Sequence, residues 1–227
     1  VALALALAFW RALPPSQHFE RRPLAFASLT SSLRDHVRDP ALAILFAEAA
    51  LLMGAFVTVY NYATFRLLGA PFDLSQAAAS AVFGAYVMGI VASPTAGALT
   101  ALIGRRRLLW LSIGLMLAGI LATLSSMLWL FVAGMLAMTC GFFGAHTVAS
   151  TWVGQRALKA RAQASALYLF LYYAGSSVAG TAGGLFFAAF GWPGVVTFTA
   201  TLVAAAFALA LRLSRITRES PTAAAPQ

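Results

Sequence analysis

Two long stretches without charge constrain the fold of this chain more than any other feature. One runs from Leu108 to Gln155 and the other from Ala162 to Leu211, and neither contains Asp, Glu, Lys or Arg. A continuous helix of about 50 residues would be roughly 75 Å long, whereas the hydrocarbon core of a bilayer is about 30 Å thick and is crossed by about 20 apolar residues. Each stretch therefore predicts two membrane crossings.

Composition supports a membrane protein and excludes the soluble classes. Of the 227 residues, 61% are hydrophobic and 9% are charged, whereas about a quarter of a soluble domain is charged. The net charge of +9 would indicate a nucleic-acid partner in a soluble protein, but the cations here lie between apolar spans, so we expect no nucleic-acid partner. Cys140 is the single cysteine and is interpreted as a small buried hydrophobe.

The pattern predicts an all-α integral membrane protein in four parts. They are the end of a truncated transmembrane helix at 1–12, a cytoplasmic loop with a short surface helix at 13–40, a six-helix transmembrane bundle at 41–211 and a cytoplasmic tail, disordered toward its end, at 212–227. The surface helix is predicted from an apolar stripe at spacings of three and four residues, made of Phe26, Leu29, Leu33 and Val37.

The six spans follow from the apolar runs and from the residues that interrupt them. We expect them at about 41–64, 75–103, 108–124, 128–154, 164–190 and 195–211. Pro94 predicts a kink near Ser93 in the second span. The sequence Gly191-Trp192-Pro193-Gly194 predicts the turn between the last two spans.

Basic residues predict the orientation, because Lys and Arg of short loops are retained in the cytoplasm. With these spans, every basic residue except Arg66 falls on one side of the membrane. These residues are Arg11, Arg21, Arg22, Arg34, Arg38, Arg105, Arg106, Arg107, Arg156, Lys159, Arg161, Arg212, Arg215 and Arg218. Both ends of the chain are therefore predicted to be cytoplasmic.

The loop after the second span carries a motif. Residues 97–106 read GALTALIGRR, which resembles the loop signature G-x-x-x-D-[RK]-x-G-[RK]-[RK] of the major facilitator superfamily. The matching residues are Gly97, Gly104, Arg105 and Arg106. Ala101 and Leu102 replace the Asp and its basic neighbour, so the charge pair of the full signature cannot form. What remains is an expected tight turn with two glycines and cations at the lipid headgroups.

A second motif lies in the fifth span. Residues 175–184 read GSSVAGTAGG, which resembles the family's antiporter motif G-x-x-x-G-P-x-x-G-G. Gly175, Gly183 and Gly184 match, and the proline is absent. Independently of the family, Gly180 and Gly184 form a small-x-x-x-small face that predicts close helix packing; a role in a conformational switch is the alternative.

The resemblance extends over nearly the whole chain and implies helices six to twelve of a major facilitator. The runs 141–150, 162–168 and 172–176 are most similar to bacterial arabinose and drug efflux permeases. The resemblance implies a secondary transporter of the bacterial inner membrane with two six-helix halves, proton-coupled efflux of a small organic solute such as a drug or sugar, and no cofactor. The implied partners are the lipid bilayer, a missing N-terminal half of the same polypeptide, the solute and protons. The implied cavity is lined by the first, second, fourth and fifth complete spans.

Two titratable residues inside the spans are candidates for proton coupling. Glu48 is the only acidic residue within a span, and a charge there costs about 2.5 to 3.5 kcal/mol on insertion scales. His146 is the only intramembrane histidine, and counting along the helices places it at a depth similar to that of Glu48. The two could share a proton or pair. Alternatively, Glu48 reaches cytoplasmic water or an arginine, and His146 bonds a backbone carbonyl, Thr147 or Ser150.

Polar residues in the spans are candidates for solute contacts, because an amide or hydroxyl at depth needs a partner. The candidates are Asn61, Tyr86, Tyr172 and Ser176. Tyr62 and Tyr168 lie toward span ends and are predicted to be interfacial anchors.

Two other kinds of function are alternatives to a carrier half. Ser176 or Ser177 with His146 would supply the residue types of an intramembrane serine protease, but the order and flanking residues differ from those of rhomboid proteases, so no catalytic residue is predicted. There is no metal-ligand cluster or phosphate-binding loop in the sequence. The main alternative is a six-span protein that acts as a homodimer or as an accessory subunit without transport of its own.

Overall fold

The computed structural model describes residues 2–13 and 26–219, and these residues form helices and no strands. They fall into two units that divide after Ser31. The first contains α1 (Ala2–Ala12), whose side chains are all exposed. Residues 14–25, which include Arg21 and Arg22, and the predicted disordered end at 220–227 lie outside the described residues.

Helix α2 (Phe26–Arg38) occupies the position of the predicted surface helix. Leu33 and Val37 of its apolar stripe are exposed, and His36 is buried. The side chains of Phe26 and Leu29 are outside the described part.

Helix α3 (Pro40–Leu68) begins at a well-defined N-cap and forms the core of the second unit. The Asp39 carboxylate accepts hydrogen bonds from the backbone amides of Ala41 (2.9 Å) and Leu42 (3.1 Å), and Pro40 occupies the first turn, where its missing N–H costs nothing. In its most apolar window 67% of the residues are buried. A helix this apolar and this covered packs against neighbours on most sides.

The second membrane pass combines α4 (Gln76–Ser80), a 3-10 segment η1 (Ala81–Val87) and α5 (Met88–Ile103). The departure from α-helix therefore lies before the position where Pro94 predicts a kink, and α5 continues through Pro94. Only 11% of this pass's most apolar window is buried. Most of its surface is therefore open to lipid or to a protein partner.

Helices α6 (Arg105–Ala122) and α7 (Leu128–Arg156) form a closely packed antiparallel pair. A Cβ added at Gly119 would overlap the backbone of Met138 and Gly134, and one added at Gly141 would overlap the backbone of Met116 and Ser112. The helices approach this closely because glycine carries no side chain.

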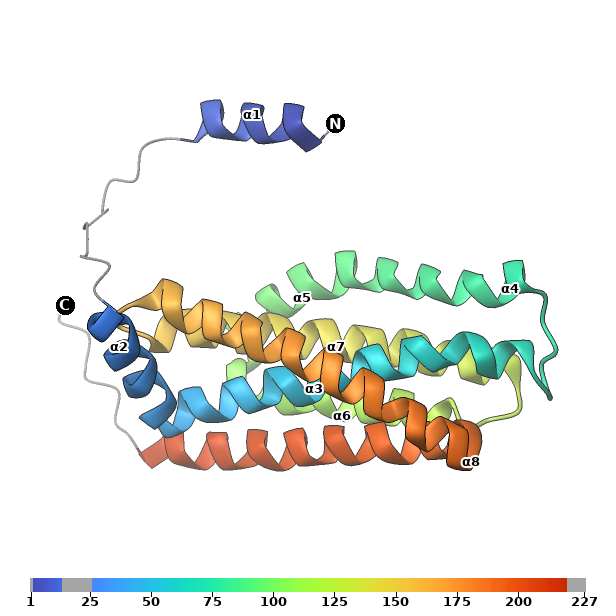
Figure 1. The fold of residues 1–227 in the computed structure, drawn as a ribbon. Helices are drawn as coiled ribbons and strands as arrows, with labels where there is room; N and C mark the ends of the chain where they lie inside the picture. The colour runs from blue at the N-terminus through green and yellow to red at the C-terminus, as the bar shows by residue number, and fades with distance from the viewer. Residues whose placement is uncertain (1, 14–25, 220–227) are drawn as a thin grey trace. The chain divides into compact units, whose positions relative to one another are not determined.

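The last two passes, which share the label α8 (Arg161–Glu219), are two helices that reverse direction at Gly191 (Figure 1). Gly191 has φ 60° and ψ −149°, a left-handed conformation that glycine adopts without strain. The Trp192 indole N–H donates to the Thr123 carbonyl oxygen at 2.9 Å, which fixes the turn to the end of α6. The helix continues to Glu219, beyond the expected start of the tail at residue 212.

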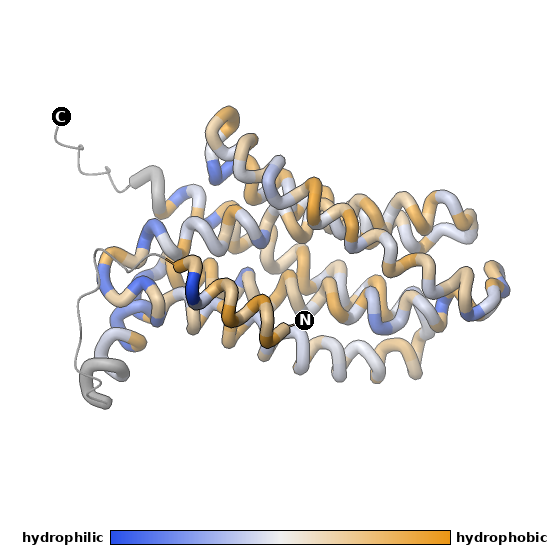
Figure 2. The backbone as a smooth tube through the Cα atoms, turned by 90° about the horizontal axis from the view of Figure 1, so that it is seen from above, coloured by the Kyte–Doolittle hydropathy of each residue, from blue (hydrophilic) through white to orange (hydrophobic). Residues whose placement is uncertain are grey.

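The second unit is an all-α membrane bundle. Four described segments are long and apolar enough to cross a bilayer: Pro40–Leu68, Gln76–Ile103, Leu128–Arg156 and Arg161–Ile216. The last of these reverses at Gly191 and so supplies two passes, and α6 is an 18-residue apolar helix headed by three arginines. Six passes result. Figure 2 shows hydrophobic residues along the helices and hydrophilic residues mainly toward their ends.

Candidate functional site

Glu48 is the most unusual polar group in the bundle. It lies on α3, is 0% exposed, and neither of its carboxylate oxygens has a hydrogen-bond partner among the described residues. Its neighbours along the helix include Leu45 and Leu52, both buried. Because buried polar groups are normally hydrogen-bonded, an isolated carboxyl requires a functional explanation.

Tyr168 bonds one of the two titratable candidates and interacts electrostatically with the other. Its hydroxyl lies 3.1 Å from His146 Nδ1 and close enough to the Glu48 carboxyl to interact with it electrostatically. No hydrogen bond or ion pair joins Glu48 directly to His146 in the described part of the chain. The three side chains come from α3, α7 and α8, and Tyr168 is the one that interacts with both of the others.

The prediction that Tyr168 is an interfacial anchor is wrong. The residue is 2% exposed. Its hydroxyl is paired with the His146 ring inside the bundle, so it has no need of the polar headgroup region. Tyr62 also packs inward, where its hydroxyl donates to the Gly180 carbonyl at 3.2 Å and its ring stacks on Phe187.

An aromatic cluster extends from this group to the surface. Its core is the stacked pair Phe56 and Phe142, with ring centroids 4.0 Å apart. The cluster as a whole consists of Phe56, Tyr60, Phe83, Tyr86, Phe142, Phe143, His146, Tyr168, Tyr172 and Tyr173.

The position of the aromatic cluster makes it a candidate wall of a solute cavity. Its members come from α3, η1, α7 and the first half of α8, the four passes that the family resemblance implies for the cavity. Phe83, Tyr86 and Tyr173 are between 40% and 61% exposed, whereas Phe56 and Phe142 are buried. The cluster therefore extends from buried rings in the interior to exposed rings at the surface of the bundle.

The predicted solute-contact residues divide into two groups. Tyr86 and Tyr172 are in the aromatic cluster, with centroids 5.4 Å from Phe56 and 4.9 Å from His146 respectively. Asn61 is exposed and lies near Gly180, where an added Cβ would be 3.2 Å from the Asn61 amide nitrogen. Ser176 donates to the Tyr173 carbonyl at 2.9 Å, so its hydroxyl is used within its own helix.

Glycines of α8 lie directly against α3. A Cβ at Gly175 would overlap the backbone of Ala50, one at Gly183 would overlap the Thr58 side chain, and one at Gly184 would lie 2.7 Å from the Tyr62 hydroxyl. Gly180 adds the contact with Asn61 described above. The motif therefore lies at the closest approach of two passes.

The loop-signature residues lie at the arginine-rich end of the bundle. Gly104 has φ 81° and ends α5, but Gly97 is helical and has no atom within 4 Å of its Cβ position, so the turn uses one glycine and not the expected two. The Arg105 guanidinium lies over the Trp152 ring, 4.4 Å from its centroid, and donates to Gln155 at 3.0 Å. Arg105 thereby ties the start of α6 to the end of α7, whereas Arg106 lines grooves at this end.

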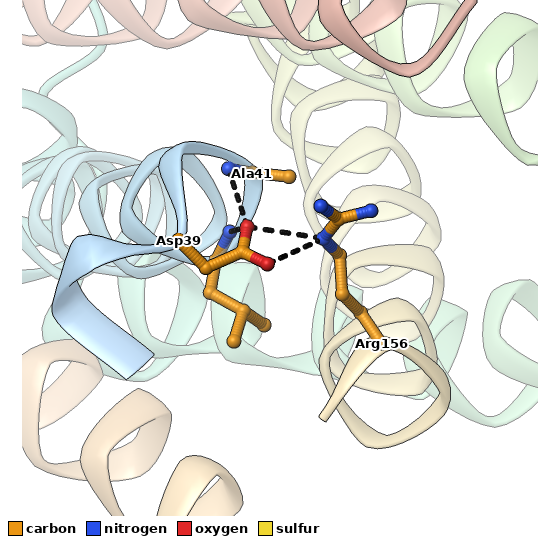
Figure 3. A network of polar contacts seen from close by, with 4 residues as sticks. Asp39, Ala41 and Arg156 are labelled. Atoms are coloured by element: carbon orange, nitrogen blue, oxygen red, sulfur yellow. Dashed lines mark hydrogen bonds and ion pairs between the residues drawn. The ribbon is translucent and has the colours of Figure 1, made fainter. Parts of the chain in front are cut away.

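An ion pair at the same end joins α3 to α7 (Figure 3). The Arg156 Nε–H donates to both carboxylate oxygens of Asp39 at 3.0 Å, while the same carboxylate caps α3 through Ala41 and Leu42. Burial by itself would raise the pKa of Asp39, but the bond from Arg156 and the backbone amides outweigh it and lower the pKa below its ordinary value of 3.8. The Asp39 carboxylate therefore both caps α3 and joins it to α7.

The most informative residues that sequence reasoning missed are aromatic and hydroxyl side chains. Tyr60 pairs its hydroxyl with Thr139 at 2.7 Å across α3 and α7. Phe56 and Tyr60, four residues apart on one helix, and Phe142 and His146, four apart on another, share faces at helical spacing. That spacing was visible in the sequence, but it does not indicate which faces meet.

Comparisons with known proteins identify the family. A family model described as Major Facilitator Superfamily matches residues 51–227. The inner membrane transport protein YnfM of Escherichia coli is 49% identical over 214 residues, which cover 94% of this chain and 51% of that protein. The uncharacterized MFS-type transporter YybF of Bacillus subtilis is 43% identical over 215 residues, which cover 95% of this chain and 53% of that protein.

A similar match extends to a third bacterium. An uncharacterized transporter of Buchnera aphidicola subsp. Schizaphis graminum is 36% identical over 203 residues, covering 89% of this chain and 49% of that protein. The chain thus spans about half the length of the curated relatives it matches. The names of all three relatives describe them as transporters or as a transport protein. The chain belongs to the major facilitator superfamily.

Proposed function

We propose that this chain is the C-terminal half of a proton-coupled carrier that exports a small organic solute by alternating access. Two observations support a missing N-terminal half of the same polypeptide. The chain aligns with about half of each relative, and the pass from Gln76 to Ile103 leaves most of its apolar window uncovered. A second bundle against this face would enclose a cavity at the interface between the halves.

The observation that carries the proton-coupling proposal is the isolation of Glu48. A carboxyl that is fully buried in a span and has no partner among the described residues is costly, and such groups in membranes mark proton and ion pathways. The Tyr168 hydroxyl interacts electrostatically with Glu48 and bonds the His146 imidazole, and both groups can donate and accept a proton. Glu48 is the proton-carrying site, and His146, through Tyr168, is its exchange partner.

The aromatic cluster is the proposed solute wall. Aromatic rings bind the apolar faces of organic molecules through large contact area and offset stacking. Tyr86 and Tyr172 place hydroxyl groups at this wall, which suits a ring-containing drug or sugar with a few polar substituents. Asn61 and Ser176 would contribute at the edge of the cavity.

The glycine contacts between α8 and α3 serve the motion of the carrier. Gly175 lets α8 approach the backbone of α3, and Gly183 leaves room for the Thr58 side chain, so the pair would move as one rigid body when the halves rock. Asp39 and Arg156 would hold the cytoplasmic end of the same unit together.

The charges support an orientation, and the relatives support a location. The end of the bundle that contains Arg105, Arg106, Arg107 and Arg156 faces the cytoplasm under the positive-inside rule. The membrane is the bacterial inner membrane, and the chain's two ends are cytoplasmic.

Everted membrane vesicles that contain this chain joined to the proposed N-terminal half test this function. After respiration has acidified the lumen, a transported solute should dissipate the pH gradient as protons leave in exchange, and an acridine dye in the vesicles reports this as a rise in fluorescence. Ethidium, chloramphenicol and arabinose would be the probes. At least one should raise the fluorescence with the wild type, and Glu48→Gln should abolish the response.

The matched control is Asp73→Asn, which removes an exposed acidic charge from the loop between the first two passes. It should retain the wild-type response. A response in Glu48→Gln as large as that in the control would overturn the coupling role of Glu48.

A further inference from the structure

A groove between the start of α6 and the end of α8 is lined by both arginines and apolar residues. The two helices pack side by side, and the groove has a volume of about 260 Å³. It is lined by Arg106, Arg107, Trp110, Leu211, Ser214 and Arg215. The sequence separates the two sides of this groove by about a hundred residues, so only the fold brings them together.

The cations of the groove favour an anion between them. Arg107 and Arg215 are exposed, and neither takes part in an ion pair with an acidic residue in the described part of the chain. Like charges that face one groove repel each other, and a bound anion converts this repulsion into attraction. Arginine suits a phosphate in particular, because its planar guanidinium donates two parallel hydrogen bonds.

The residue order at the groove is typical of the depth of lipid headgroups. Arg107 is followed immediately by the buried residues Leu108 and Leu109, which begin the apolar part of α6. Trp110 is one turn further in, where tryptophan is enriched at membrane interfaces. If the arginines hold the anionic group of a ligand, the apolar part of that ligand would therefore lie against Trp110 and Leu211.

We propose that this groove binds an anionic phospholipid such as phosphatidylglycerol or cardiolipin. The headgroup phosphate lies between Arg107 and Arg215, and an acyl chain lies along Trp110 and Leu211. Basic pockets between transmembrane helices are suited to such headgroups. A zwitterionic lipid is disfavoured because its own cation would be placed near the arginines. The site does not depend on the proposed transport function.

Native mass spectrometry of the purified protein, titrated with phosphatidylglycerol or phosphatidylcholine, tests the site. The test variant is Arg107→Gln/Arg215→Gln. The control is Arg34→Gln/Lys159→Gln, which removes the same charge from exposed positions outside the groove. Each cation near an anionic lipid raises the affinity about fivefold. The test variant lacks two such cations, so it should bind phosphatidylglycerol roughly 30-fold more weakly. The control should stay within about threefold of the wild type.

A second measurement covers the case in which the test variant fails to fold. In nanodiscs of the wild-type protein, phosphatidylglycerol with brominated acyl chains should quench Trp110 fluorescence more than brominated phosphatidylcholine does. Trp110→Phe isolates that signal from the other tryptophans. Equal quenching by the two lipids, or equal loss of phosphatidylglycerol binding in the test and control variants, would overturn the proposal.

Discussion

Replacing Gly175 by alanine tests the close packing of α8 on α3. The added methyl group would overlap the carbonyl oxygen, Cα and carbonyl carbon of Ala50. These are backbone atoms of a buried helix, so rotation of a side chain cannot relieve the overlap and the two helices must move apart. Overpacking of this kind costs about 1–3 kcal/mol, which corresponds to a decrease in Tm of about 2–12 °C for a chain of this size.

Gly97→Ala is the matched control for this prediction. The substitution is chemically the same and also lies within a helix, but no atom is within 4 Å of the added methyl group. Its Tm should stay within about 2 °C of the wild type, because surface changes of this kind are within about 0.5 kcal/mol. Thermal unfolding in detergent, followed by fluorescence-detected size exclusion, measures both. Equal Tm values for the two variants would refute the described contact between α3 and α8.

Three further predictions concern single contacts. Because the pKa of Asp39 is lowered in the folded state, its ion pair with Arg156 stabilises the protein at neutral pH by at most about 1 kcal/mol, and this contribution is lost as the pH falls through the lowered pKa, below 3.8. Asp39→Asn keeps the helix cap but removes the ion pair, so its Tm should decrease less on acidification than that of the wild type. An equal decrease in Tm would contradict the pairing. Trp192→Phe leaves the Thr123 carbonyl without its indole donor and should lower the free energy of unfolding by about 1–3 kcal/mol in thermal denaturation; an unchanged value would show that this bond does not hold the turn. Tyr168→Phe removes the hydroxyl next to His146 and should shift the pH profile of solute-induced proton flux, so a wild-type profile would argue against a role for Tyr168 in coupling.

The helices were predictable from the sequence because the bilayer imposes a simple rule on the chain. Runs of about 20 apolar residues must be helical, and their ends were visible at Arg105, at Ser125 and at the turn that begins with Gly191. The observed α7 begins at Leu128, as expected, and α3 begins at Pro40 beside the expected residue 41. The 3-10 segment at Ala81–Val87 was not predictable, because its local sequence is as apolar as that of its neighbours.

The arrangement of the candidate site was less predictable, because it depends on which helix faces meet. Glu48 and His146 were identified by chemistry alone, as the two titratable groups within the spans. The bond of Tyr168 with His146 and its electrostatic interaction with Glu48 could not be read from its place near a span end. The pairing of Asp39 with Arg156 joins residues 117 apart in sequence, and a single sequence carries no signal for such a pair.

The most direct test of proton coupling through Glu48 compares two modes of transport in proteoliposomes. They contain this chain joined to the proposed N-terminal half, and the solute is one found in the vesicle assay. A pH gradient drives accumulation only if protons move with the cycle, whereas exchange of labelled for unlabelled solute requires only that the loaded carrier reorients. We predict that Glu48→Gln loses accumulation and keeps exchange, while Asp73→Asn keeps both. Accumulation by Glu48→Gln at the wild-type level would contradict the proposed role of this carboxyl.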